Sequence, residues 1–201
     1  MLLLLITVAL ICSCTDSNST KFNSKIAIDS IQKIVLDGDM ILRNGTDEVS
    51  AAARSFNRKE KLYSRCGIVQ IENDTTWVYH AIGGKYNPSN QLKREMLSSF
   101  CAQTENDKVA IFRYEMNAKE QINLKNIVHH YYQQKLPFDL FFNFNTDDAM
   151  YCAEFVFKSY NQALKNKLNA TLIKDNEGRV YVTVDDLYLN PNRNPIFFVK
   201  R

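Results

Sequence analysis

The sequence predicts an α+β domain built on an antiparallel sheet. Two observations support this: helical and extended segments are mixed in order, and neighbouring extended segments are joined by hairpin-type connections. Only 6 Gly and 4 Pro occur in 201 residues, so the chain has few strong breaks. At roughly 100–200 residues per domain, this length fits one domain, which we expect to cover residues 25–201.

The composition is that of an ordinary globular protein, with 45% apolar and 23% charged residues. It excludes disorder, a collagen-like structure and a coiled coil as the main architecture. The 25 Lys and Arg against 22 Asp and Glu give a formal net charge of only +3. This near balance gives no electrostatic reason to expect nucleic acid as a partner.

In the first half of the domain, apolar spacing and turn residues define the expected elements. Thr46 is a candidate cap for a helix whose first turn is acidic, and residues 72–75 form the turn of a hairpin. The expected elements are a helix at 24–34, a strand at 40–43, a helix from Thr46 to about 57, and strands at 66–71 and 77–81.

In the second half, Ser89 is a candidate helix cap, and the segment 136–139 with its proline breaks a long helix. The expected elements are a helix at 89–100, a strand at 109–114, helices at 118–134 and about 149–168, and closing strands at 180–184 and 196–199.

The N-terminus has the features of an export signal. Residues 1–12 are apolar with one exception, and this run is shorter than the about 20 residues that span a bilayer. Residues 11–14 resemble a bacterial lipobox, which implies cleavage before Cys14 and lipid attachment to its sulfur. We therefore expect a signal peptide at 1–13, a lipidated tether at 14–24, and a protein anchored to a membrane of the bacterial cell envelope. The alternative is a simple cleaved signal in which Cys14 has no role.

The cysteines do not form a disulfide framework or a zinc site. Cys12 and Cys14 belong to the signal, which leaves Cys66, Cys101 and Cys152, an odd number at wide spacing. A single bridge between Cys66 and Cys101 is compatible with an oxidising compartment. Cys152 would then be an unpaired thiol.

Cys152 is the main candidate for chemistry. It lies at or near a predicted helix start, since residues 146–148 are start signals. A thiol there sits in the positive potential of the helix N-terminus, which lowers its pKa and favours the nucleophilic thiolate. The alternative is a small buried core residue, because Cys152 shares a helical stripe with Val156 and Tyr160.

A cysteine nucleophile needs a base, most often a histidine. His129 and His130 are adjacent on a predicted helix, so they point about 100° apart and do not act as a pair. His80 lies on the second strand of the predicted hairpin and shares a face with Val78. It is either a structural strand histidine or the catalytic base.

Taken together, these residues resemble the YiiX-like proteins, permuted papain-like relatives of the NlpC/P60 amidases. The resemblance implies a circularly permuted papain-like fold and a thiol hydrolase acting on an amide or peptide bond. In such a fold the cysteine opens a helix that packs on an antiparallel sheet. The segments that carry it are Asp37-Gly38-Asp39-Met40-Ile41, Tyr63-Ser64-Arg65-Cys66-Gly67-Ile68-Val69, Pro137-Phe138-Asp139 and Tyr151-Cys152-Ala153-Glu154-Phe155-Val156.

One position departs from the family pattern, in which a histidine base follows the serine of Ser-His-x-Gly-Ile-Val. Arg65 stands there, and an arginine stays protonated and takes no proton from a thiol. Either His80 serves as the base from the next strand, or the site has lost its base. In both cases Arg65 can pair with a substrate carboxylate. Tyr63 and Tyr151 are candidates to line the site, although aromatic residues are more often part of the core.

The expected function is a thiol amidase or peptidase. Cys152 would attack the carbonyl carbon, helix-start amides would stabilise the oxyanion, and His80 would move the proton. The expected substrate is an amide bond in peptidoglycan peptides, a small peptide or an acyl-amide conjugate. One alternative is a non-catalytic ligand-binding lipoprotein, and another is an envelope protein with no small-molecule site. No motif predicts a metal or a cofactor.

Overall fold

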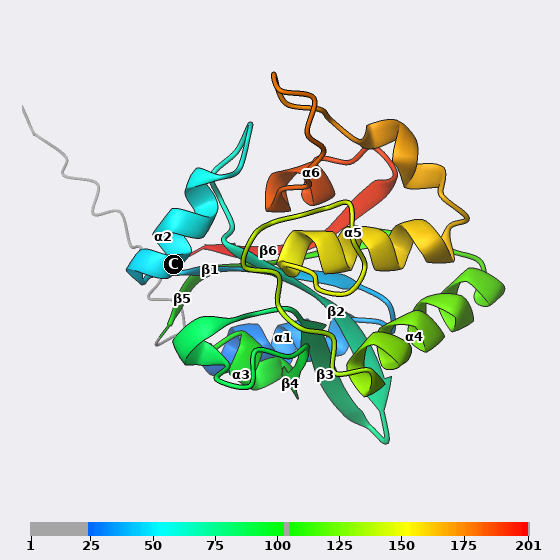
Figure 1. The fold of residues 1–201 in the computed structure, drawn as a ribbon. Coiled ribbons are helices and arrows are strands. Elements are labelled where there is room, and N and C mark those ends of the chain that lie inside the picture. The colour runs from blue at the N-terminus through cyan, green and yellow to red at the C-terminus, as the bar shows by residue number, and fades with distance from the viewer. Residues whose placement is uncertain (1–23, 103–104, 201) are drawn as a thin grey trace, which may run out of the picture.

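A six-stranded antiparallel sheet forms the centre of the computed structural model, which describes residues 24–102 and 105–200. Helices lie on both faces of the sheet (Figure 1). The predicted α+β architecture is therefore confirmed. Residues 1–23, which contain the predicted signal peptide and Cys14, lie outside the described residues. Within the described ranges, no helix is both long enough and apolar enough to cross a membrane.

The strands follow the spatial order β4-β3-β2-β1-β5-β6. The predicted hairpin is confirmed, with Ile68 opposite Tyr79. Its turn residues Asn73 and Asp74 have positive φ angles of 47° and 61°, which these two residue types tolerate better than most. The strands are β1 (Met40–Gly45), β2 (Arg65–Glu72), β3 (Thr75–His80), β4 (Lys93–Met96), β5 (Asn106–Tyr114) and β6 (Arg193–Lys200).

The helices begin at recognisable caps. Asp47, one residue after the predicted Thr46, caps α2 by accepting the Ser50 N–H at 3.1 Å. Asn117 and Glu120 form a reciprocal capping box at α4. The helices are α1 (Ser24–Ile34), α2 (Glu48–Ser55), α3 (Leu97–Phe100), α4 (Ala118–Gln133), α5 (Cys152–Ala163) and α6 (Val184–Tyr188), with 3₁₀ turns η1 (Gly84–Tyr86) and η2 (Lys167–Thr171).

Two predicted elements were wrong. Only the last four residues of the helix expected at 89–100 are helical, as α3, because the four residues before them form the edge strand β4 and pair with β3. The strand expected at 180–184 is instead an irregular segment leading into α6, with Val180 in an isolated bridge to Lys174. The first error reflects pairing with a neighbouring strand, and in the second the segment finds no strand to pair with beyond the single bridge to Lys174.

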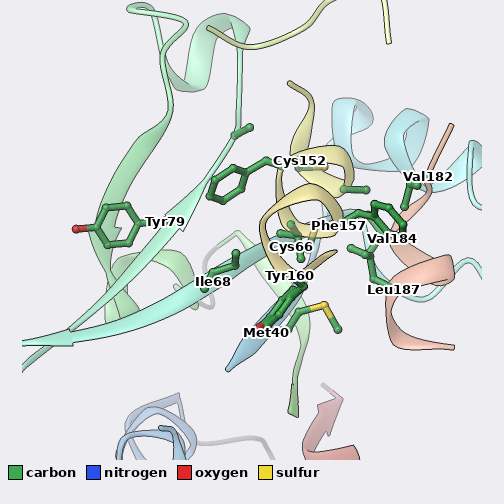
Figure 2. Packing of buried hydrophobic residues seen from close by; sticks show 14 of the residues in the cluster. Met40, Cys66, Ile68, Tyr79, Cys152, Phe157, Tyr160, Val182, Val184 and Leu187 are labelled. Carbon is green, nitrogen blue, oxygen red and sulfur yellow. The ribbon is translucent and has the colours of Figure 1, made fainter. Parts of the chain in front are cut away.

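The sheet separates two apolar cores. Cys66, Ile68 and Tyr79 point toward α4, α5 and α6, whereas Val69 and Val78 point toward α1 and α3. This division follows from the alternation of side chains along each strand. Figure 2 shows the first core, in which residues of the sheet meet Cys152, Phe157 and Tyr160 of α5.

Helix α5 is the central element of the larger core. Ten of its twelve residues are buried. The Tyr160 hydroxyl donates to the carbonyl of Gly38 at 2.7 Å, two residues before β1, and Asn161 Oδ1 accepts the Leu168 N–H at 2.9 Å. At the other end, Glu154 Oε2 accepts the Tyr151 N–H at 3.3 Å. Both ends of α5 are therefore fixed.

A buried carboxylate joins α6 to the segment that precedes β2. Asp185 is fully buried and accepts three backbone N–H groups, from Arg58, Lys59 and Glu60, at 3.2, 2.6 and 3.1 Å. Although burial opposes it, hydrogen bonding from the Thr183 hydroxyl and these N–H groups lowers the pKa of Asp185. The charged form of Asp185 therefore stabilises the fold.

We expect Asp185→Asn to lower the free energy of unfolding by about 3 kcal/mol, because an amide group satisfies fewer buried N–H donors than a carboxylate. Since the folded pKa is lowered, this stabilisation is present above the unfolded pKa and is lost as pH falls through the folded value. Urea unfolding at neutral and acidic pH measures both effects. Glu177→Gln, in an exposed ion pair, is the control; an equal loss in both variants would contradict the assignment.

Candidate functional site

Cys152 is the first residue of α5 and lies in the wall of a cavity of about 510 Å³. Tyr151 is the N-cap residue, with extended backbone. The Cys152 residue is 8% exposed, and the cavity is its route to solvent. A thiol at this position faces both the positive end of α5 and a space large enough for a small ligand.

Three groups stabilise the Cys152 thiolate. The Cys66 thiol donates a hydrogen bond to it, the Arg65 guanidinium lies beside it, and the Ala153 N–H also donates to it. Together they lower the pKa of Cys152 against the opposing effect of burial. Burial, followed by the bond to Cys152, raises the pKa of Cys66. These opposite shifts favour the charged form of Cys152 and the protonated form of Cys66.

The cavity wall is mainly apolar and aromatic. Phe56 and Phe142 stack with ring centroids 5.5 Å apart, and Phe142 also contacts Tyr151 at 5.1 Å. Residues from two segments far apart in the sequence, 138–145 and 175–184, also line the cavity. The aromatic residues of the lining are Phe56, Phe138, Phe141, Phe142, Phe144, Tyr151 and Tyr181.

Three charged residues line the cavity: Arg65, Asp175 and Arg179. Asp175 Oδ2 lies 2.9 Å from Nε of Arg179, and this hydrogen bond lowers the pKa of the carboxyl group. Asp175 is therefore ionised at neutral pH and holds no proton to donate. Arg65 is the charged side chain in contact with the sulfur of Cys152.

The structure does not bring His80 to Cys152. A Cβ atom on Gly67 would lie 2.6 Å from Val78 Cγ1 and 3.1 Å from His80 Cβ, so these three positions share one face of the sheet. Cys66, the next residue along β2, points to the opposite face, where Cys152 lies. The prediction that His80 takes the thiol proton is therefore not compatible with this geometry.

His80 belongs to a separate polar cluster. Its Nε2 lies 2.8 Å from Glu95 Oε1, and its ring packs edge-on against Phe100 at 5.1 Å. Burial lowers the pKa of His80 to about 4, despite the opposing effect of Glu95, so its ring is neutral at physiological pH. Of the two roles expected for His80, a structural strand histidine or the catalytic base, this geometry fits the structural one.

The other two histidines are also away from the cavity. His129 Nε2 lies 3.0 Å from Glu72 Oε1, beside the ring of Tyr79, and His130 is on the same helix, α4. Among the residues of 24–102 and 105–200 that line the cavity, none is a histidine. Glu154 is not among them either, although burial raises its pKa to about 7; its Oε1 lies 2.8 Å from Lys158 Nζ.

The three predicted binding residues have different positions. Arg65 and Tyr151 line the cavity, and the Tyr151 hydroxyl accepts the Val182 N–H at 2.9 Å. Tyr63 is buried against Tyr188, with ring centroids 5.3 Å apart, and is not in the lining. Sequence reasoning did not assign the aromatic segment at 138–144 or the segment at 175–184 to the site, because no local pattern shows that these segments approach Cys152.

Cys66, Cys101 and Cys152 are free thiols. Cys66 lies in the core beneath α5, whereas Cys101 lies in the core on the other face of the sheet. The bridge considered between Cys66 and Cys101 is therefore absent. Cys66 instead contacts Cys152.

Residues 35–188 match the model of a family described as permuted papain-like amidase enzyme, YaeF/YiiX, C92 family. In Escherichia coli (strain K12), the uncharacterized protein YiiX is 29% identical over 130 residues. This match covers 63% of the chain and 58% of the length of YiiX.

A crystal structure described as that of the metalloprotein yiiX from Escherichia coli O157:H7 shares the fold. The TM-score is 0.63 at 21% identity, over 84% of this chain and 98% of that one. In the part of this chain that the structure describes, no group of three or more His, Cys, Asp or Glu side chains is arranged to hold a metal ion. Residues 24–102 and 105–200 therefore offer no site with three such metal ligands.

We expect Cys152 to react with iodoacetamide at about pH 6, where an ordinary thiol of pKa about 8.5 is slow. Cys66→Ala and Arg65→Gln each remove a group that stabilises the thiolate, so each should slow labelling, by about tenfold for every unit by which the pKa rises. Peptide mass spectrometry locates and times the label.

Cys101→Ala is the matched control, because this buried thiol has a pKa raised to about 12 and lies on the other face. It should leave Cys152 labelling unchanged. Labelling of Cys152 that is slow at pH 6 and insensitive to Arg65→Gln would contradict the proposed thiolate.

Proposed function

The chain belongs to the permuted papain-like amidase family (YaeF/YiiX, C92), and from this premise we propose that Cys152 is the nucleophile of an acyl-transfer reaction. One observation carries the proposal: the cavity of about 510 Å³ has Cys152 in its wall, with Arg65 and Cys66 stabilising the thiolate. A stabilised thiolate that opens onto a ligand-sized cavity has the geometry required for covalent catalysis.

In the proposed reaction, the Cys152 thiolate attacks the carbonyl carbon of a bound substrate, and the carbonyl oxygen becomes an oxyanion. Backbone N–H groups at the start of α5 and the Arg65 guanidinium are the positive groups next to the sulfur. Fixed donors of this kind stabilise developing negative charge, because they need no reorganisation when the charge forms. When the intermediate collapses, the bond from the carbonyl carbon to the leaving group breaks, the leaving group departs with the electron pair of that bond, and the acyl group stays on Cys152 as a thioester. An amine leaving group must also take up a proton.

The cavity lining supports a substrate with an apolar or aromatic group next to the reacting carbonyl. The rings of Phe56 and Phe142 lie in the same wall as the thiol, and Arg179 adds a positive charge at the edge. A small peptide or an acyl conjugate has this character. An amide in peptidoglycan peptides is the substrate that the sequence resemblance implies, and it remains part of the proposal.

We also propose that the protein is a lipoprotein of the bacterial cell envelope. The support is the lipobox-like segment 11–14 and the polar residues that follow it. Attachment of lipid to Cys14 would hold the domain at a membrane surface through a short tether.

The second candidate is a non-catalytic ligand-binding lipoprotein. The observation in its favour is that Arg65, rather than a histidine, contacts Cys152, and that no histidine of residues 24–102 and 105–200 lines the cavity. Arg65 would then hold an acidic group of the ligand. This candidate predicts binding without any covalent adduct on Cys152.

We expect p-nitrophenyl phenylacetate to acylate Cys152 and release a burst of p-nitrophenolate close to the enzyme concentration. Cys152→Ala removes the nucleophile and should abolish the burst, whereas Cys101→Ala should retain it, because Cys101 lies on the other face of the sheet. Stopped-flow absorbance measures the burst, and intact-protein mass spectrometry identifies the adduct. A burst of equal size in Cys152→Ala would exclude the proposed nucleophile.

Phe142→Ala removes a ring that stacks on Phe56 and contacts Tyr151 at the cavity wall. We expect it to weaken binding of the phenylacetyl probe by about tenfold, which corresponds to about 1.4 kcal/mol, with a smaller effect on the maximal acylation rate. Ile122→Ala, at an exposed position on α4, is the control for loss of an apolar side chain. The concentration dependence of the burst rate separates the two parameters, and equal effects of both substitutions would argue against a role for the aromatic wall.

A further inference from the structure

We propose that this site takes its acyl group from a thioester rather than from an amide. The inference rests on the proposed role of Cys152 as nucleophile. Among the acyl conjugates and amides proposed above as substrates, it selects a thioester conjugate over an amide. It follows from the groups next to the Cys152 sulfur, which include Arg65 and Cys66, and from the charged residues that line the cavity.

The two kinds of bond differ in what the leaving group needs. When the C–N bond of an amide breaks, the nitrogen must receive a proton, because an amine does not leave as an anion. In papain-like chemistry a histidine supplies that proton. When the C–S bond of a thioester breaks, the sulfur leaves as a thiolate with the electron pair of the bond. No proton donor is required.

Among the described side chains next to the Cys152 sulfur, none is suited to give that proton. Arg65 contacts the sulfur but does not release a proton at physiological pH. Asp175 is ionised and bound to Arg179, and the Tyr151 hydroxyl, whose pKa burial raises, accepts a hydrogen bond from Val182. Cys66 points at Cys152, but its raised pKa keeps its proton in place.

The ionisable groups beyond the cavity wall are also unsuited. Glu154 is held beside Lys158 and does not line the cavity. His80 is across the sheet, paired with Glu95, and His129 is paired with Glu72. What remains at the sulfur is positive charge and hydrogen-bond donation. These groups favour a thiolate nucleophile and an oxyanion, but they do not protonate an amine.

The reaction is a thiol–thioester exchange. The Cys152 sulfur forms a bond to the acyl carbon, the bond from that carbon to the substrate sulfur breaks, and the electron pair leaves with the second sulfur as a thiolate. Charge and protons balance without a co-reactant. The reverse exchange passes the acyl group to an acceptor thiol. Water is a poor acceptor here, because the groups next to the sulfur, Arg65 and the protonated Cys66, are not suited to take its proton.

The test uses two probes that differ in one atom. S-phenylacetyl-N-acetylcysteamine is a thioester, and its matched amide carries NH in place of the sulfur. The wild-type protein should form a phenylacetyl adduct on Cys152 with the thioester and none with the amide, as measured by intact-protein mass spectrometry. Since thioesters are intrinsically more reactive than amides, the decisive comparison is between variants.

Arg65→His places an imidazole next to the sulfur, where it can donate a proton. We expect this substitution to raise the rate of amide cleavage by about a hundredfold, the lower end of the usual contribution from general acid–base catalysis. The thioester-to-amide rate ratio should fall accordingly. Arg94→His is the matched control, because Arg94 of strand β4 stacks on Trp77 of strand β3 and does not line the cavity. This substitution should leave the thioester-to-amide rate ratio unchanged.

A second measurement keeps the proposal testable if Arg65→His does not fold. In the wild type, the rate of acylation by the thioester should rise once with pH, as the thiolate forms, and then stay level. A descending limb near neutral pH would reveal a proton donor and overturn the proposal. Amide cleavage by the wild type at a rate within tenfold of the thioester rate would also overturn it.

The outcomes distinguish this inference from the function on which it rests. If p-nitrophenyl phenylacetate acylates Cys152 but the amide is also cleaved, the inference fails and the proposed nucleophile stands. If no probe forms an adduct on Cys152, both fail and the ligand-binding candidate is favoured.

Discussion

The packing of α5 on β2 is the contact on which the rest of the structure depends. Helix α5 is buried along almost its whole length, and its two ends are fixed by Glu154 and Asn161. In the last turn of the helix, the Tyr160 hydroxyl donates a hydrogen bond to the carbonyl of Gly38, two residues before β1. Because so little of the helix is free to move, the first residue, Cys152, is held against Cys66 of the central sheet. The site is therefore a consequence of core packing.

The sheet also divides the polar groups of the protein into two sets. On one side, the Cys66 thiol donates to the Cys152 sulfur, which also lies beside Arg65. On the other, His80 is paired with Glu95. Strand β2 contributes Cys66 and Arg65 to the first set, and its neighbour β3 contributes His80 to the second. The backbone of the sheet therefore separates His80 from Cys66, although the two residues lie on neighbouring strands.

Much of the fold could be predicted from local pattern, and the failures have a common cause. The hairpin of β2 and β3 and the long helix α4 follow from spacing and turn residues within each segment. The residues of β4 carry no such signal, because their conformation is set by pairing with β3. Alternation correctly placed Val78 and His80 on one face. Which face carries α5 is a tertiary property, so the position of His80 relative to Cys152 could not be deduced locally.

The cavity is lined both by regular elements of the core and by irregular connections. Cys152 and Arg65 come from elements that also hold the core, whereas residues 138–145 and 175–184 line the cavity from irregular connections. Substitutions in the two connections can change the shape and polarity of the cavity at little cost to folding, because loops tolerate variation that a packed helix does not. Reactivity and selectivity are thus encoded in separate parts of the chain, which lets relatives diverge in ligand while the helix that carries the thiol stays the same.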